Sequence, residues 1–160
     1  MKQNFRAPWS SKLRITTGLV LAFFMVMIVA LPTPASWIIG GVLIVSAALA
    51  VQGYSIQDGN LLIHRLGWAT RYDLSSLVRV EVNPGATIGS IRTWGVGGLL
   101  GFVGYFRNAL LGSYRAYATN QENSVILEFS ETKVVVTPET PEEFAALVSR
   151  ELDATPSEGG

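Results

Sequence analysis

The chain of 160 residues is long enough for one ordinary domain and a smaller addition. Only 15% of its residues are charged, and its apolar residues gather between Leu13 and Val51. Its net charge is zero. After residue 119 the sequence has nine acidic and two basic residues, which argues against a nucleic-acid partner. The lack of cysteine excludes disulfides and thiolate chemistry.

The apolar part of the chain predicts two membrane-spanning helices joined by a short turn. After Arg14, seventeen consecutive residues up to Leu31 carry no charge. A helix of about 17–20 residues crosses most of a ~30 Å hydrocarbon core. Pro32-Thr33-Pro34 cannot continue that helix, and a second uncharged run follows at once. We therefore predict a transmembrane hairpin over residues 13–52.

The two apolar segments also have other interpretations. A cleaved signal peptide also places basic residues before an apolar stretch, but Thr33-Pro34-Ala35 is a poor cleavage site. The second run also suits a buried helix of a soluble core, although its closeness to the first favours a hairpin. Four basic residues precede the first run, none lies in the turn, and Arg65 and Arg71 follow the second. The positive-inside rule then predicts a multi-pass protein of the plasma or inner membrane with both termini cytoplasmic.

After residue 52 the pattern changes to that of short strands. Asp58-Gly59 between two extended runs is a strong hairpin signal. Val78, Val80 and Val82 alternate with other residues and are predicted to share one face of a strand. Residues 125–136 read as two more strands joined by a turn. Such strands with polar outer faces predict an antiparallel barrel or sandwich.

The chain closes with a predicted helix. Thr140-Pro141-Glu142-Glu143 is a capping box with proline at the first helical position and acids in the first turn. Phe144, Leu147, Val148 and Leu152 then form one apolar stripe. One stripe means one buried face, so we expect this helix to lie on the strands.

A series of motifs follows the predicted hairpin. It comprises Tyr54-x-Ile56-x-Asp58-Gly59-x-Leu61-x-Ile63-x-Arg65, Arg92-Thr93-Trp94-Gly95-Val96-Gly97-Gly98, Gly101-x-x-Gly104-Tyr105-Phe106-Arg107-Asn108, Gly112-x-Tyr114-x-Ala116-Tyr117-Ala118-Thr119, Val136-Thr137-Pro138 and Pro141-Glu142-x-Phe144. Over about residues 53–152 the series resembles the bacterial pleckstrin-homology (PH) domains, particularly those attached to membrane segments. The resemblance implies a small, strongly bent antiparallel sheet closed at one end by the C-terminal helix.

Together these observations predict a membrane-anchored, mainly β protein. Its N-terminal two-helix transmembrane hairpin precedes a PH-like antiparallel β-barrel or sandwich, which a C-terminal α-helix caps. The predicted segments are a cytoplasmic N-terminal segment (1–12), the hairpin (13–52, with helices at about 13–31 and 35–52), the PH-like domain (53–152) and a disordered tail (153–160).

The sequence offers no arrangement of residues typical of catalysis, a cofactor or a metal ion. His64 is the only histidine and lies in a predicted strand, while Asp58 is explained by its turn. Glu142 and Glu143 are explained by the start of the helix. The glycines of residues 95–101 resemble a nucleotide fingerprint, but that motif needs a strand, loop and helix in a βαβ unit. We therefore predict a protein that is not an enzyme.

A stretch of aromatic and basic residues is the remaining signal. We expect residues 94–106 to form a glycine-rich loop that touches the bilayer, or else to fill the domain's own core with their aromatic rings. Arginine binds phosphate bidentately, which suits an anionic lipid or an acidic partner. A solvated surface is the alternative for these arginines. The predicted lipid- or partner-binding residues are Arg92, Trp94, Tyr105, Phe106, Arg107 and Arg115.

These features favour a membrane-tethered PH-like module that binds or scaffolds partners at the cytoplasmic face of the membrane. An anionic-lipid headgroup sensor is one alternative, and an accessory subunit of a transporter or envelope-assembly complex is another. The expected partners are membrane lipids, a membrane or cytoplasmic protein and a second copy of the chain, with no nucleic acid.

Overall fold

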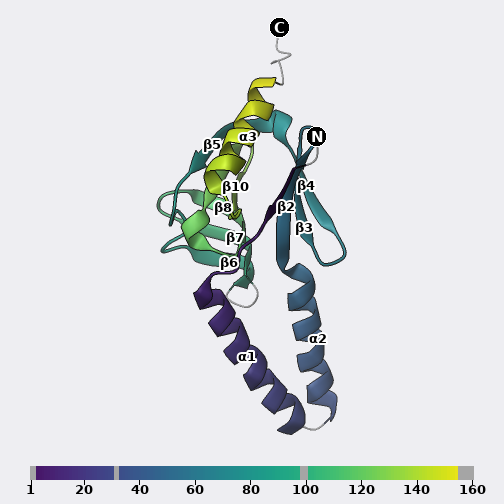
Figure 1. Ribbon diagram of the computed structural model, residues 1–160. Coiled ribbons are helices and arrows are strands. Elements are labelled where there is room, and N and C mark those ends of the chain that lie inside the picture. Colours follow the sequence, from purple (N-terminus) through teal and green to yellow (C-terminus); the bar gives the residue numbers. More distant parts are fainter. Residues whose placement is uncertain (1–2, 31–32, 98–100, 155–160) are drawn as a thin grey trace.

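The computed structural model describes residues 3–30, 33–97 and 101–154. Helices α1 (Ser11–Ala30) and α2 (Thr33–Leu49) extend side by side from one end of a β-rich domain (Figure 1). Strand β1 begins, and helix α3 (Pro141–Ala154) ends, at the opposite end of the domain. The molecule is thus a β-rich body on a helical pair.

The two helices of the pair differ in length. Among the described residues, α1 is the one helix that is long and apolar enough to cross a membrane, with 20 residues. Helix α2 has 17 residues and is also apolar. Large apolar side chains such as Val29 and Trp37 are exposed on this pair. Exposed apolar surface of this extent indicates an apolar environment or a partner.

The first sheet contains four antiparallel strands in chain order: β1 (Gln3–Arg6), β2 (Val51–Gln57), β3 (Asn60–Arg65) and β4 (Ala69–Asp73). Asp58 and Gly59 join β2 to β3 with φ angles of 51° and 69°, as the predicted Asp-Gly turn requires. Residues 3–6 belong to the predicted N-terminal segment 1–12, and the structure pairs them with β2. The helical pair is therefore inserted between two neighbouring strands.

The second sheet has the strand order β5-β9-β10-β8-β7-β6. Its strands are β5 (Leu77–Val82), β6 (Ile91–Gly97), β7 (Phe102–Asn108), β8 (Gly112–Ala118), β9 (Val125–Phe129) and β10 (Lys133–Val136). The expected all-antiparallel pairing is wrong for β8 and β10, which are parallel. The reason is that β10 returns antiparallel to β9 and fills the place between β9 and β8. In the described part of the chain the two sheets do not close into a barrel.

The main core lies between the two sheets and under α3. Tyr54, Leu61 and Leu127 are fully buried there together with Phe144 and Val148 of α3. The predicted apolar stripe of the last helix is therefore confirmed. Helix α3 continues through Ala154, two residues beyond the predicted end, and residues 155–160 lie outside the described part.

A second apolar cluster lies on the other face of the second sheet. It contains Phe106, Tyr114 and Val135, and Ala86 from the connection between β5 and β6 packs on it. Asn108 holds that connection by donating from Nδ2 to the carbonyl of Ala86 over 2.8 Å. Both faces of the second sheet are thus covered over part of their area.

The glycine-rich stretch that we predicted as a loop forms most of a β-hairpin. Strands β6 and β7 pair from Ile91 opposite Arg107 to Gly97 opposite Phe102. Gly95 and Gly104 face each other, and a Cβ atom on either would collide with the backbone of the other strand. Close approach of two strands therefore explains these glycines. Residues 98–100 of the predicted loop lie outside the described part.

One strand residue differs in orientation from the prediction. A bulge between Leu77 and Arg79 displaces Val78, which is 64% exposed. Leu77 takes the buried place, while Val80 and Val82 pack against the main core as expected. The prediction that Val78 shares their face is wrong because a bulge adds one residue to the period of two.

Candidate functional site

The structure divides the six predicted binding residues between two faces of the second sheet. Trp94, Tyr105 and Arg115 are register neighbours on β6, β7 and β8, so they share one face. Phe106 lies on the other face, where it is 5% exposed and stacks on Tyr114. The expectation of a core role thus holds for this ring, whereas Trp94 is 77% exposed.

The two remaining predicted arginines are separated in the same way. Arg92 is the register partner of Phe106 and shares its face. Arg107 follows Tyr105 by two residues and lies on the face of Arg115. Both arginines are exposed. The predicted residues therefore do not form one continuous site.

Arg115 connects the two sheets. Its guanidinium carbon lies 4.7 Å from the centre of the Tyr105 ring, and its Nη1 donates to the Tyr72 hydroxyl over 3.4 Å. Tyr72 belongs to β4 of the first sheet, and its hydroxyl lies 2.9 Å from that of Tyr117 on β8. One cation, three aromatic rings and two of their hydroxyls thus meet where the two sheets contact each other.

Arg65, which the sequence analysis did not select, completes this group. Its guanidinium carbon lies 4.9 Å from the centre of the Tyr117 ring and 5.9 Å from that of Trp68. Its Nε is buried and has no hydrogen-bond partner among the described residues. Stacking on aromatic rings therefore holds this side chain. We call Arg65, Tyr72, Arg115 and Tyr117 the arginine–tyrosine cluster.

The charge of the cluster is uncompensated within the described residues. The two ion pairs there join Arg79 to Glu81 and Lys133 to Glu128, so neither cluster arginine has a carboxylate partner. Burial, followed by the hydrogen bond with Tyr117, raises the pKa of Tyr72 and keeps its hydroxyl protonated. The hydrogen bond to Tyr72 raises the pKa of Arg115. The cluster thus places two arginine side chains beside the protonated hydroxyl of Tyr72.

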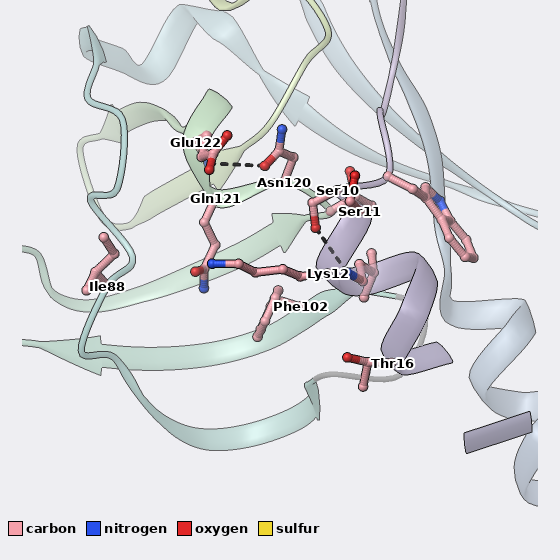
Figure 2. A pocket seen from close by; sticks show the side chains of 12 residues that line it. Ser10, Ser11, Lys12, Thr16, Ile88, Phe102, Asn120, Gln121 and Glu122 are labelled. Carbon is pink, nitrogen blue, oxygen red and sulfur yellow. Dashed lines mark hydrogen bonds between the residues drawn. The ribbon is translucent and has the colours of Figure 1, made fainter. Parts of the chain in front are cut away.

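A cavity of about 560 Å³ lies where α1 meets the domain. Its lining includes Lys12 in the first turn of α1, Phe102 at the start of β7 and the segment 119–122. Figure 2 shows the side chains of Lys12 and Gln121 pointing toward each other across it. The backbone N–H of Leu13 donates to Ser10 Oγ over 3.2 Å and caps α1. Residues of α1 and of the second sheet therefore line this junction cavity together.

The four tryptophans are all exposed. Trp9 lies just before α1, and Trp68 lies in the turn between β3 and β4. Trp37 lies near the start of α2, at the other end of the helical pair. Trp9 and Trp68 therefore lie near the end of the helical pair that adjoins the domain, and Trp37 lies near its other end.

The other polar residues considered from the sequence have local roles. His64 Nε2 lies 2.7 Å from Ser55 Oγ on the neighbouring strand. Asp73 Oδ1 accepts from the backbone N–H of Ser75, which lowers the pKa of the carboxyl and caps a 3-10 turn. Within the described ranges no three acids or histidines gather as metal ligands.

Comparison with known proteins identifies the family of this chain. The model of the bacterial PH domain family matches residues 52–151, from β2 to α3. Searches of curated proteins and of solved structures found no match. The matched span includes all four members of the arginine–tyrosine cluster and leaves out β1 and the helical pair. Because it covers more than half of the sequence, the chain belongs to the bacterial PH domain family.

Proposed function

We propose that this protein is a membrane-anchored, non-enzymatic PH-type module that binds partners at the cytoplasmic face of the membrane. The pairing of β1 with β2 carries the proposal. The two strands pair antiparallel from Gln3 opposite Ile56 to Arg6 opposite Gly53. The chain therefore leaves for α1 and returns from α2 at one edge of the domain. Two spans satisfy this arrangement, because they bring the chain back to its starting side.

The dimensions of the helices are consistent with two spans. At 1.5 Å per residue, α1 reaches about 30 Å and α2 about 26 Å. A span a few ångströms short is accommodated by local thinning of the bilayer at a modest cost in free energy. Arg6, Lys12 and Arg14 lie before or at the start of α1, whereas the residues joining α1 to α2 carry no charge. This asymmetry favours a cytoplasmic domain.

A binding role agrees with the family and with the exposed surface. PH domains are generally binding modules rather than catalysts. Strand β6 is an edge of the second sheet and presents exposed Ile91 and Trp94. A free edge strand with apolar side chains is a common docking surface for proteins. A protein partner at β6 is therefore the first candidate.

An anionic-lipid headgroup sensor is the second candidate function. The observation that favours it is the arginine–tyrosine cluster, whose two arginines lack carboxylate partners in the described part of the chain. Tethering raises the effective concentration of lipid at the domain, so weak intrinsic affinity suffices.

Crosslinking in native membranes, followed by identification of captured proteins, tests the scaffolding role. The full chain is compared with Trp94→Ala and with a chain whose residues 11–49 are replaced by an unrelated two-span hairpin. We expect Trp94→Ala to lose specific partners and the hairpin exchange to keep them. If the partners are lost only when the hairpin is exchanged, the protein is an accessory subunit of a membrane complex. If all three chains capture the same proteins, β6 is not the docking surface.

A further inference from the structure

The face of the second sheet that carries the second apolar cluster has a hollow between aromatic rings. Strands β7 and β8 place three register pairs on this face: Phe102 with Ala118, Gly104 with Ala116, and Phe106 with Tyr114. These pairs share a face because every second residue of a strand points to the same side. Rings therefore stand at both ends of the row, whereas the glycine and the alanine in its middle have almost no side chain to fill the space.

A cavity of about 40 Å³ lies in this hollow, between the sheet and the connection from β5 to β6. We call it the inner pocket, and its lining includes Thr87, Ser90, Phe106, Ala116 and Ala118. Phe102 and Gln121 line both the inner pocket and the junction cavity, so the two cavities adjoin each other. Figure 2 shows these two side chains at the junction cavity.

Two hydroxyl groups of the inner pocket have protons without acceptors. Thr87 is 6% exposed, and its Oγ1 has no hydrogen-bond partner among the described residues. Ser90 Oγ accepts from the Tyr114 hydroxyl over 2.7 Å and from Asn108 Nδ2 over 3.0 Å, which occupies both of its lone pairs. Its own proton meets no acceptor in the described part of the chain. Unpaired donors of this kind cost free energy, which a bound acceptor recovers.

The lining of the inner pocket defines the chemical group that fits it. Within the described ranges no charged side chain lines this pocket, so an ion there would lose its hydration without a counter-charge. A carbonyl group is neutral, and its oxygen has two lone pairs that can accept from both hydroxyls. Unlike a hydroxyl, it brings no further proton that needs an acceptor.

The size of the inner pocket limits that group to a few atoms. Its volume of about 40 Å³ exceeds the space of about 10–15 Å³ that one water molecule needs. It is much smaller than the cavity of about 150 Å³ that holds benzene. A compact end group such as acetyl meets both limits. The rest of a ligand has room in the junction cavity, whose volume of about 560 Å³ is typical of small-molecule sites.

We propose that the inner pocket and the junction cavity together bind a small neutral molecule with an apolar body and a compact end that carries a carbonyl group. The carbonyl oxygen accepts from Thr87 and Ser90, and the apolar body packs on the half-buried ring of Phe102. The lining of these cavities includes neither the exposed side chains of β6 nor the arginine–tyrosine cluster. The proposal therefore goes beyond the binding of a protein partner or a lipid headgroup.

Methyl NMR of the full chain in an uncharged detergent tests the proposal. With isotope-labelled alanine, the methyl groups of Ala116 and Ala118 report on the inner pocket. The probes are acetophenone and α-methylstyrene, in which a CH₂ group replaces the carbonyl oxygen. Their concentrations are corrected for partition into the detergent. We expect acetophenone to shift both methyl resonances saturably and α-methylstyrene to bind at least fivefold more weakly.

Three variants locate the binding and its cause. Thr87→Val removes the hydroxyl and should weaken acetophenone binding at least fivefold, while the affinity for α-methylstyrene stays within twofold. Thr93→Val is the matched control, because Thr93 is an exposed threonine of β6 outside both cavities, and it should leave both affinities within twofold. Ala116→Leu fills the inner pocket and should abolish the saturable shift of the Ala118 methyl group.

The comparison of the two probes in Thr87→Val decides the matter if Ala116→Leu does not fold. A wild-type chain without saturable shifts overturns the proposal, and so does one that binds the two probes equally well. Equal losses of both probes in Thr87→Val would show that the hydroxyl does not recognise the carbonyl group and would overturn it as well.

Discussion

The ring of Phe5 meets the ring of Phe144 edge-on, with centroids 5.2 Å apart and planes at 85°. Phe5 belongs to β1, before the helical pair, and Phe144 to α3, near the end of the chain. Arg6 extends this contact, since its carbonyl accepts from the backbone N–H of Glu139 over 3.0 Å. The domain is therefore assembled from both sides of the helical insertion.

Substitution of Phe5 and Phe144 measures how much their contact stabilises the domain. We expect Phe144→Ala to cost about 3–5 kcal/mol of unfolding free energy, because the ring is fully buried. Phe5→Ala should cost less, about 1–2 kcal/mol, because Phe5 is half-buried. A double-mutant cycle by thermal or denaturant unfolding should show a coupling of about 0.5–1.5 kcal/mol. Strict additivity would show that the rings do not interact.

Replacement of the helical pair gives a second prediction. A chain in which a short glycine-serine turn replaces residues 9–50 keeps β1 next to β2 and should fold without detergent. A fragment that starts at Gln52 lacks β1 and uncovers Phe144. It should melt at a clearly lower temperature or aggregate. Equal melting temperatures for the two would mean that β1 adds nothing to the domain.

Local signals in the sequence explain which parts of the fold were predicted. The Asp58-Gly59 turn and the stripe of α3 depend on residues within one or two turns of each other, and both are confirmed. The four residues of β1 carry no periodic pattern, and their partners follow some fifty residues later. The sequence alone therefore does not predict this strand.

The candidate site was less accessible to prediction for a similar reason. Trp94, Tyr105 and Arg115 were selected from composition, and their common face depends on a strand register that short motifs do not specify. Arg65 and Tyr72 reach Tyr117 from the other sheet. A contact between sheets leaves no pattern in a single sequence, so three of the four members of the arginine–tyrosine cluster, Arg65, Tyr72 and Tyr117, were not predicted.

The facing glycines of β6 and β7 give a third prediction. Gly104 has a φ of 143°, and a Cβ there meets the backbone of Trp94 and Gly95. We expect Gly104→Ala to cost about 3 kcal/mol, from backbone strain and overpacking together. Gly59→Ala is the control, since its φ is 69° but no atom lies within 4 Å of the added Cβ. Its cost should be nearer 1 kcal/mol. Similar losses at both positions would refute close strand approach as the cause.

The buried Tyr54 gives a prediction about pH. Burial raises the pKa of Tyr54 to about 12, and its hydroxyl donates to the carbonyl of Tyr117. Above pH 10 the unfolded chain loses this proton while the folded chain keeps it, so stability falls as the pH rises from 10 to 12. The loss should reach about 2–3 kcal/mol by pH 12.

Tyr54→Phe is the control for that titration. It removes the hydroxyl and its hydrogen bonds with Tyr117 and Thr137, so it should be less stable than the wild type at pH 8. The difference between the two chains should shrink between pH 10 and 12. A constant difference across this range would show that another group causes the alkaline transition.

The most direct test of the account is the side of the membrane on which each segment lies. The chain contains no cysteine, so single substitutions report accessibility to an impermeant maleimide without further changes. Ala35→Cys lies at the start of α2, and Ser130→Cys lies on an exposed turn of the domain. We expect Ala35→Cys to be labelled in intact cells and Ser130→Cys only after the cells are permeabilised. Labelling of Ser130→Cys in intact cells, or equal labelling of both, would contradict a cytoplasmic domain on a two-span anchor.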